Sequence, residues 1–496
     1  MNAPHAPQDT RLALQPMAST RCSRSVYFDR FARPELEKEE RRQFFNDGFA
    51  SQNLPNKVES WNAWLQNSSL RLRPEDLLFA QLQSRLMVNM AGGVMENAGL
   101  CLDHFGMPYI PGSAVKGCSR RMAIQRLLET ETPEAEDQKA KKADLLVQIA
   151  LAFGWSEQDW KTKRDFKPRP KSGETDEQFE FRWQKDWEKK RSDFAYACGD
   201  VRWSDVFIEA VQRALWKQVL RTEPPAEPGA FARAWKPRLS HFAGKVQFLP
   251  AYPLNVKLTD SFHPTPDELG ELELDVVTVH HKKYYAGPER PNDPASARSW
   301  ERDWGNAPDI EEPVPVVFPA VAPGHVFVFV VQAQESTMDS LAALARRWLA
   351  DSLSTFGLGA KTAAGYGWFD CSDTLQKAVR REWDRLVHEF KKAQAEAQAK
   401  REAAETAAKA KQAEEERLDK APPSERYRAE YAKLGDEPFA ALAKKFSELN
   451  DDQRHGFVLA LKDRRETAKR WAKKKPELLK AWQDYAQKLQ PPIQLP

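Results

Sequence analysis

The sequence lacks the features that mark secreted, membrane-spanning and metal-binding chains. Its few cysteines are scattered without a CxxC pair, at Cys22, Cys101, Cys118, Cys198 and Cys371. This spacing argues against a zinc knuckle or a disulfide framework and fits a reducing, cytoplasmic location. The opening MNAPHAPQDTRLALQP has no apolar core of a signal peptide. The most apolar stretch, 314–333, is broken by prolines and a glycine, so we expect strands there rather than a membrane helix.

Net charge is also nearly absent. The chain has 75 Lys and Arg residues against 72 Asp and Glu residues, a formal charge of +3 over 496 residues. Bulk charge therefore predicts no nucleic-acid binding, and any basic site must be local. A chain of this length has room for two to four domains.

Composition changes along the chain suggest four segments. We expect an N-terminal extension over 1–84, partly disordered and partly helical, and a mixed α+β domain over 85–373. The domain contains a charged stretch with little periodicity at about 129–195, which we interpret as an insertion. A long exposed helix over 374–420, rich in Ala, Lys and Glu, and a small helical bundle over 421–496 complete the predicted organisation.

Within the α+β segment the residue patterns predict strands and one clear helix. The apolar positions of 339–356 recur with a 3.6-residue period, which indicates a helix that ends at Gly357. Pro323 and Gly324 would join two strands of a hairpin over 314–333. Further strand signals lie at 79–90, 198–208, 244–253 and 272–287.

Glycine is scarce, with 22 in the chain, yet four lie in the stretch FGLGAKTAAGYGWF (356–369). A phosphate-binding Walker A loop needs GxxxxGK[ST] between a strand and a following helix. Here Ala360 precedes Lys361 and the predicted order is helix, loop, strand, so nucleotide hydrolysis is excluded. A glycine-lined backbone with Lys361 and Thr362 suits contact with a sugar-phosphate chain. The alternative is a plain connection whose glycines serve turns: Gly357, Gly359, Gly365 and Gly367.

The segment YIPGSAVKGCSRR (109–121) predicts a turn followed by a helix. Pro111 and Gly112 would make the turn, and Ser113 can cap the helix that starts there. The expected buried face of the helix comprises Val115, Cys118 and Met122.

The same helix carries an unfavourable concentration of positive charge. Lys116 and Arg120 are four residues apart, and like charges at that spacing cost a few tenths of a kcal/mol. Arg121 adds to the crowding, and positive charge near a helix N-terminus opposes the macrodipole. An anionic ligand would offset both costs, whereas a solvated basic face is the alternative.

A third cluster, VHHKKYYAG (279–287), mixes aromatic rings with positive charge. This mixture suits stacking on unpaired bases together with phosphate contacts. The alternatives are an ordinary edge strand or a metal site at the adjacent histidines, which on a strand point to opposite faces. We see no third metal ligand in useful spacing and expect neither a metal nor a cofactor. The cluster comprises His280, His281, Lys282, Lys283, Tyr284 and Tyr285.

Together these motifs carry a resemblance to a known family. PGSAVKGCSRR early and GLGAKTAAGYG late resemble the paired motifs of the RAMP superfamily of CRISPR proteins. The segments GKVQFLPAYP, LELDVVTVHHKKYY and PVVFPAVAPGHVFVFVV are similar to the sixth Cmr subunit of type III-B effector complexes. The resemblance covers roughly 85–370, with 129–195 poorly matched.

The resemblance implies a fold and a function. The fold would be α+β, with a ferredoxin-like (RRM-like) core that contains insertions. The function would be non-catalytic binding of the CRISPR guide RNA (crRNA) toward its 3′ end, aiding capture of target RNA in antiviral defence. The implied partners are crRNA, target RNA, the repeated backbone subunit and the neighbouring head-end subunit, with no membrane involved.

The resemblance also implies roles for single residues. Guide phosphates would be contacted by Ser113, Lys116, Arg120, Arg121, Lys361 and Thr362. The four loop glycines would permit close approach of the RNA backbone. His280, Tyr284 and Tyr285 would contact RNA or a neighbouring subunit.

Two other function classes remain open from the sequence. Some RAMP relatives cut RNA, and the pair Asp103 and His104 is the one candidate here for general acid/base cleavage of CRISPR repeat RNA. An Asp beside a Gly-Met-Pro turn is usually a turn residue, so we expect no catalysis. The other class is a protein-only adaptor that uses the helical tail.

Overall fold

The computed structural model describes most of the chain in two compact units, Met1–Val387 and His388–Pro496. Within the predicted N-terminal extension, residues 1–22 and 51–71 lie outside the described residues. Those residues are 23–30, 36, 38–50, 72–89, 100–130, 136–199, 205–258, 263–279, 281, 284, 287, 293–305, 312–474 and 476–495.

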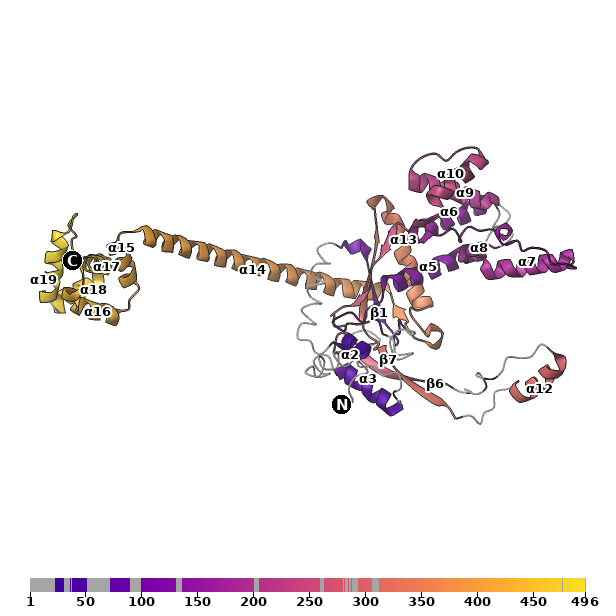
Figure 1. Cartoon of the computed structure of the whole chain (residues 1–496), viewed down its shortest axis with the longest axis horizontal. Helices are drawn as coiled ribbons and strands as arrows, with labels where there is room; N and C mark the ends of the chain where they lie inside the picture. The colour runs from indigo at the N-terminus through magenta and orange to yellow at the C-terminus, as the bar shows by residue number, and fades with distance from the viewer. Residues whose placement is uncertain are drawn as a thin grey trace. The chain divides into compact units, whose positions relative to one another are not determined.

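The first unit is built on an antiparallel sheet with the spatial order β4-β8-β1-β9, to which β5 adds a second pairing with β8. Helix α5 (Gly112–Glu129) follows β1 and helix α13 (Asp339–Thr355) lies between β8 and β9. Figure 1 labels β1 of this sheet and the helices α5 and α13. Strands β4 and β5 pair with successive stretches of β8 and can be counted as one edge strand. The order of this sheet and its two helices along the chain is then β-α-β-β-α-β, in an α+β unit. The strands are β1 (Leu77–Leu82), β4 (Val246–Phe248), β5 (Tyr252–Pro253), β8 (Val326–Ala333) and β9 (Phe369–Asp370).

Both faces of this sheet are covered, which explains why β1 is buried at every position. Successive side chains of a strand point to opposite faces. Leu78 and Leu82 belong to the core shared with α5 and α13, whereas Phe79 lies against the start of the long helix α14 (Asp373–Lys420). There the rings of Phe79 and Trp383 are 5.8 Å apart.

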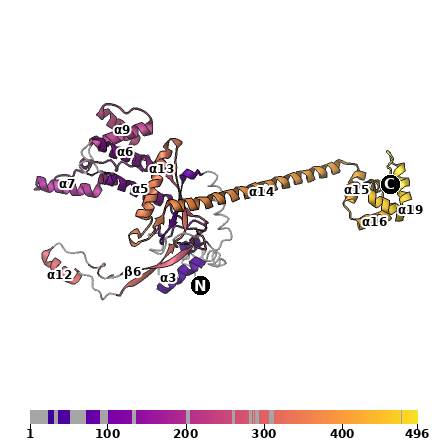
Figure 2. The same ribbon diagram turned by 180° about the vertical axis from the view of Figure 1, so that it is seen from behind.

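The predicted hairpin over 314–333 is wrong in its pairing. Strand β7 (Val314–Val321) pairs with β6 (Leu272–Val279, labelled in Figure 2) in a separate two-stranded ribbon. Strand β8 joins the main sheet. His325 attaches the turn between β7 and β8 to the residues before β6. Its ring is hydrogen-bonded to the carbonyl oxygen of Ala322 at 2.7 Å and accepts the N–H of Gly270 at 3.0 Å. Strands that are apolar along their whole length do not specify their partner by sequence pattern.

Helices α2 (Arg24–Arg30) and α3 (Lys38–Ala50) of the N-terminal extension pack with the ribbon. Arg24 anchors them, because its buried guanidinium donates to the carbonyl oxygens of Gly270 at 2.6 Å and Phe49 at 3.2 Å. Helix α12 (Pro294–Trp304) lies between β6 and β7 in sequence.

The charged stretch at about 129–195, which we interpreted as an insertion, contains regular helices. Helix α6 (Glu136–Phe153) contributes Ile149 and Phe153 to the core that α5 and α13 share. The strand expected at 198–208 is wrong from Asp205 onward, because Ile208, Val211 and Leu215 form the buried face of a helix. The other elements are β2 (Gly154–Trp155), α7 (Asp176–Lys190), α8 (Asp193–Cys198), α9 (Asp205–Leu220), α10 (Pro228–Leu239) and β3 (Phe242–Ala243).

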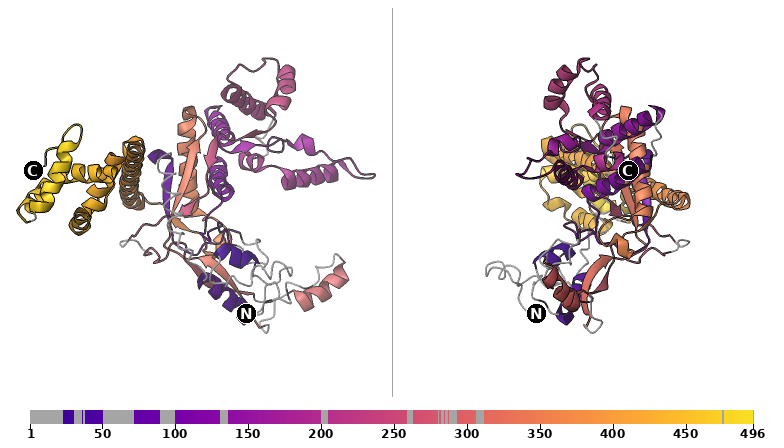
Figure 3. Two further views of the ribbon diagram at one scale, coloured as in Figure 1. Left: turned by 60° about the vertical axis from the view of Figure 1, so that its left-hand side comes forward. Right: turned by 90° about the vertical axis from the view of Figure 1, so that its right-hand side faces the viewer.

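The second unit has a hydrophobic core of its own, formed by five helices after α14 (Figure 3). Helix α14 is one continuous helix of 48 residues, and α15 begins three residues after its end, at Pro423. Phe439, Phe457 and Trp482 are fully buried in this core. The helices are α15 (Pro423–Ala432), α16 (Asp436–Lys444), α17 (Asp451–Asp463), α18 (Arg465–Lys474) and α19 (Pro476–Lys488). The domain boundaries inferred from the sequence stay predictions.

Candidate nucleic-acid interface

The two glycine-containing motifs meet in the fold although they are far apart in the chain. Cys118 Sγ, on α5, lies 3.8 Å from the carbonyl oxygen of Gly357, a residue 239 positions later. The guanidinium of Arg121 lies 4.2 Å from the ring centroid of Phe356. The first half of α5 and the start of the 356–367 loop therefore pack against each other.

The loop after α13 is held by backbone hydrogen bonds to itself and to residues 85–87. The N–H of Leu358 donates to Gly367 O at 2.8 Å, and the N–H of Ala360 donates to Met87 O at 2.7 Å. The N–H of Gly367 in turn donates to Arg85 O at 2.8 Å. The order helix, loop, strand is as predicted, with a short 3-10 turn over Thr362–Ala364 in the loop.

Three of the four loop glycines are required by the protein's own backbone. A Cβ at Gly367 would lie 1.9 Å from Leu358 O, and one at Gly359 would lie 2.2 Å from Met87 O. A Cβ at Gly357 would lie 2.9 Å from Gly367 O. Gly365 alone has no neighbouring atom within 4 Å, at a φ of +91°. The packing of the protein backbone is thus enough to explain the glycines at 357, 359 and 367. Close approach of RNA to the four loop glycines stays a prediction.

Lys361 projects from the loop over an aromatic surface. Its Nζ lies 3.9 Å from the ring centroid of Phe318 on β7 and 5.9 Å from that of Tyr366. The Tyr366 hydroxyl donates a hydrogen bond to Asp275 on β6. Burial lowers the pKa of Lys361, and the nearby Asp275 carboxylate acts in the opposite direction. Burial and the bond to Asp275 raise the pKa of Tyr366 to about 12, so its hydroxyl keeps its proton.

Arg85 completes this surface, and sequence reasoning missed it. Its guanidinium lies 2.6 Å from Glu273 Oε1 and 3.2 Å from Asp275 Oδ2, both on β6. No local spacing signals this cluster, because its members come from four separate segments of the chain, at 85, 273–275, 318 and 361–366.

Helix α5 begins one residue earlier than the predicted cap. Its N-cap is Pro111 and no side chain caps it, so the expected role of Ser113 as a cap is wrong; Ser113 is exposed in the first turn. Gly112 is needed because a Cβ there would lie 2.3 Å from Phe248 O. The predicted buried face is confirmed at Val115, Cys118 and Met122.

The basic residues of α5 have distinct environments. Lys116 and Arg120 lie four residues apart on α5 and so are neighbours as predicted. Burial lowers the pKa of half-buried Lys116, and Arg120 lowers it further. Arg120 already has an anionic partner, since its Nη1 lies 2.5 Å from Asp193 Oδ2 at the start of α8. Its guanidinium also lies 5.0 Å from the ring centroid of Phe194. Phosphate contacts by Lys116, Arg120 and Arg121 remain predictions.

The third predicted cluster directly follows β6 in the chain. His280, Lys282, Lys283 and Tyr285 fall outside the described residues, whereas His281 and Tyr284 are half-buried. Asp275 pairs with Phe318 under the loop, and β6 continues for four residues to Val279, about 13 Å at the rise of a strand. The first described residue of the cluster, His281, follows Val279 by two residues in the chain.

Comparison with known protein families assigns the chain. The model of the RAMP superfamily matches residues 88–370, which is more than half of the sequence. The chain belongs to the RAMP superfamily. No curated protein matches it.

Two solved structures are similar to this RAMP protein at low identity. A cryo-EM structure of the type III-B Cmr-beta bound to cognate target RNA shares 16% identity, with a TM-score of 0.27, over 68% of this chain and 74% of that chain. The crystal structure of Cmr6 from Pyrococcus furiosus shares 18% identity, with a TM-score of 0.23, over 60% of this chain and 97% of that chain.

The one candidate catalytic pair of the RAMP domain contains a turn residue. Asp103 Oδ1 accepts the N–H groups of Phe105 and Met107, each at 2.9 Å. This oxygen is committed to the turn, and the exposed His104 ring lies 3.8 Å from that of Phe105. Among the described residues, no group of three or more His, Cys, Asp or Glu side chains could hold a metal ion, and no helix is long and apolar enough to cross a membrane.

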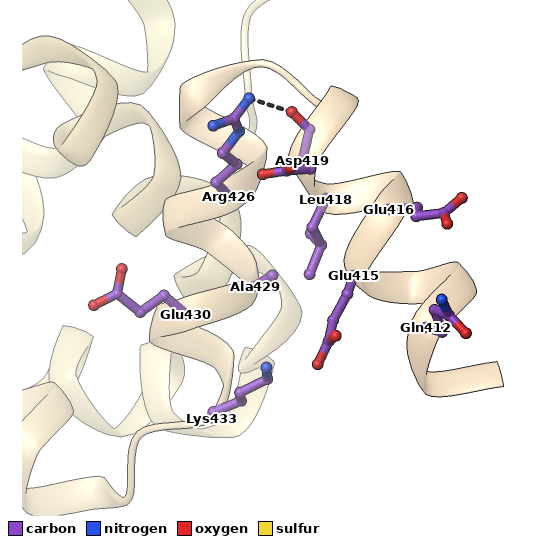
Figure 4. Close-up of a pocket in the computed structure, with 9 residues that line it drawn as sticks. All are labelled: Gln412, Glu415, Glu416, Leu418, Asp419, Arg426, Ala429, Glu430 and Lys433. Carbon is purple, nitrogen blue, oxygen red and sulfur yellow. Dashed lines mark hydrogen bonds between the residues drawn. The ribbon is translucent and has the colours of Figure 1, made fainter. Parts of the chain in front are cut away.

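A pocket of about 590 Å³ lies outside the RAMP domain, between the end of α14 and α15 (Figure 4). The guanidinium of Arg426 donates to the carbonyl oxygen of Asp419 and so closes the end of α14. The lining mixes charges of both signs, and none of the residues predicted from the sequence lines it.

Proposed function

We propose that this RAMP protein is a non-catalytic guide-RNA-binding subunit of a type III-B CRISPR effector complex. In this proposal its β-α-β-β-α-β core is ferredoxin-like, and the protein anchors crRNA toward its 3′ end and aids capture of target RNA. The complex would act in the cytoplasm in antiviral defence, with the repeated backbone subunit and the head-end subunit as neighbours. The observation that carries the proposal is the meeting of the two family motifs at Cys118 and Gly357.

The chemistry at this junction fits a phosphate chain. Among the described residues, no carboxylate lies within ion-pair distance of Lys116 or Lys361. Burial lowers the pKa of both lysines, which means that the free protein disfavours their charged forms. A phosphate oxygen beside each ammonium group would supply the missing anionic partner.

Removing both charges should release the guide. We expect Lys116→Met with Lys361→Met to lower the crRNA content of the affinity-purified complex at least tenfold, because two phosphate contacts are lost. Methionine keeps an apolar chain over Phe318, whereas glutamate at 361 would also be repelled by Asp275. The readout is crRNA per complex by quantitative RNA blotting, with subunit content checked on the same sample.

A matched control separates this site from a general effect of charge. Lys189→Met with Lys377→Met removes two exposed lysines of the same unit and should leave crRNA content unchanged. Retention of the guide by the Lys116 and Lys361 variant would favour the protein-only adaptor.

The endoribonuclease alternative has its own test. We expect no cleavage when the purified protein is incubated with CRISPR repeat RNA. Cleavage that disappears in His104→Ala would overturn the non-catalytic proposal. His104 is the suitable variant because it is exposed, whereas a change at Asp103 would also open the turn.

A further inference from the structure

The positive charge of the tail is concentrated in one short segment. Residues 421–496 contain 16 Lys and Arg against 11 Asp and Glu residues. The stretch RRETAKRWAKKKPELLK (464–480) alone contains eight against two. The rest of the tail is therefore balanced at eight against nine, and the net +6 of 464–480 exceeds the charge of the whole chain.

Most of these cations lie on the outward face of α18. The opposite face is occupied by the core, since Ala468 is fully buried and the ring of Trp471 lies 5.7 Å from that of Trp482. Residues four apart on a helix are neighbours, so the exposed cations form two adjacent rows. The first row is Arg465, Lys469 and Lys473, and the second is Arg470 and Lys474.

The protein itself neutralises little of this charge. Lys469 Nζ lies 3.3 Å from Glu466 Oε1, and Arg470 Nη2 lies 3.4 Å from Asp436 Oδ2. In the described part of the tail, no carboxylate lies within ion-pair distance of the other three exposed cations of α18, which are Arg465, Lys473 and Lys474. Like charges in rows at this spacing oppose helix formation, so the arrangement is stabilised by a polyanion.

The surroundings of α18 favour a phosphate chain over other anionic partners. A membrane-bound amphipathic helix needs a free apolar face, and that of α18 is used in the core. Protein interfaces are depleted of lysine and rich in aromatic residues. None of the exposed large hydrophobic side chains of the described structure lies between 421 and 495. We propose that the basic face of α18 binds the phosphate backbone of a nucleic acid without reading its sequence.

This surface is separate from the RAMP motifs and does not depend on the function proposed for them. With no exposed aromatic ring beside it, α18 offers no platform for base stacking. RNA and DNA should therefore bind this face alike, with strong salt dependence. Such a tail would bind any nucleic-acid strand that the second unit can reach.

The test measures binding of the full-length protein to fluorescein-labelled 20-nucleotide RNA and DNA over a range of KCl concentrations. The background is Lys116→Met with Lys361→Met, so that the motif surface is already disabled. Adding Arg465→Glu, Lys473→Glu and Lys474→Glu should weaken binding at least tenfold at low salt. It should also make the slope of log K against log[KCl] shallower by about 2, for three lost phosphate contacts on a single strand.

The matched control reverses three exposed lysines elsewhere in the same unit, Lys444→Glu, Lys445→Glu and Lys488→Glu, and should keep affinity within about twofold. Circular dichroism and thermal melting should be the same for both triple variants. If both triple variants lose the same amount of affinity, then binding depends on the total charge of the tail and not on the face of α18, and the proposal is wrong. Unchanged binding in the α18 variant, or a preference above tenfold for either sugar, would overturn it as well.

Discussion

Replacing Gly367 by alanine should lower the free energy of unfolding of the first unit by about 3–5 kcal/mol. The new Cβ would lie 1.9 Å from Leu358 O at a φ of +67°, a position rarely adopted by residues with a side chain. The conflicting atom is backbone, and its own residue donates an N–H to Gly367 O, so it has no side-chain freedom with which to move aside. Chemical denaturation followed by tryptophan fluorescence and far-UV circular dichroism provides the measurement.

Gly365 is the matched control for this effect. It has a φ of +91° in the same loop, yet no atom lies within 4 Å of the Cβ position. Gly365→Ala should cost only the backbone strain, about 1–2 kcal/mol. If Gly367→Ala costs no more than Gly365→Ala, then the tight backbone packing described for this loop is wrong.

The two glycines also show where sequence reasoning succeeds and where it stops. The period of 339–356 and a following glycine were enough to predict a helix and its end, because both signals are local. They were not enough to tell which glycines serve the fold. Gly359 packs on Met87, which is 272 positions earlier, and no local pattern reports such a contact.

Lys361 shows the same limit at the candidate site. Its charge and loop position could be read from the sequence, but the Phe318 ring beneath it could not. Phe318 belongs to an apolar run that also predicted a hairpin. The run instead divides between two sheets: its first half pairs with β6 and its second half with β1.

The basic segment of the tail was not recognised from the sequence for a different reason. The segment 464–480 is visible in the sequence, but averaging over 76 residues reduced it to a mild excess. The helical period alone does not tell which face of the helix is buried and which carries the exposed cations. The core contacts of Ala468 and Trp471 identify the buried face. A shorter window along predicted helices would have found the basic segment, though not its orientation.

The second large effect is expected from Trp482→Ala in the second unit. The indole is 1% exposed and its ring centroid lies 5.5 Å from that of Phe457, at the centre of the tail core. Removing a buried tryptophan from such a core costs about 3–5 kcal/mol. Because this core shares no buried residue with those of the first unit, the loss should be confined to α15–α19.

Hydrogen exchange measured by mass spectrometry separates the two units directly. Amides of α17 and α19 should lose protection in Trp482→Ala, whereas those of β1 and β8 should not change. Gln483→Ala, a half-buried neighbour on the same helix, is the control and should change the stability by less than about 0.5 kcal/mol. An equal loss of protection in β1 would mean that the two cores unfold as one. The independent stability that allows the tail to carry a binding surface of its own would then be absent.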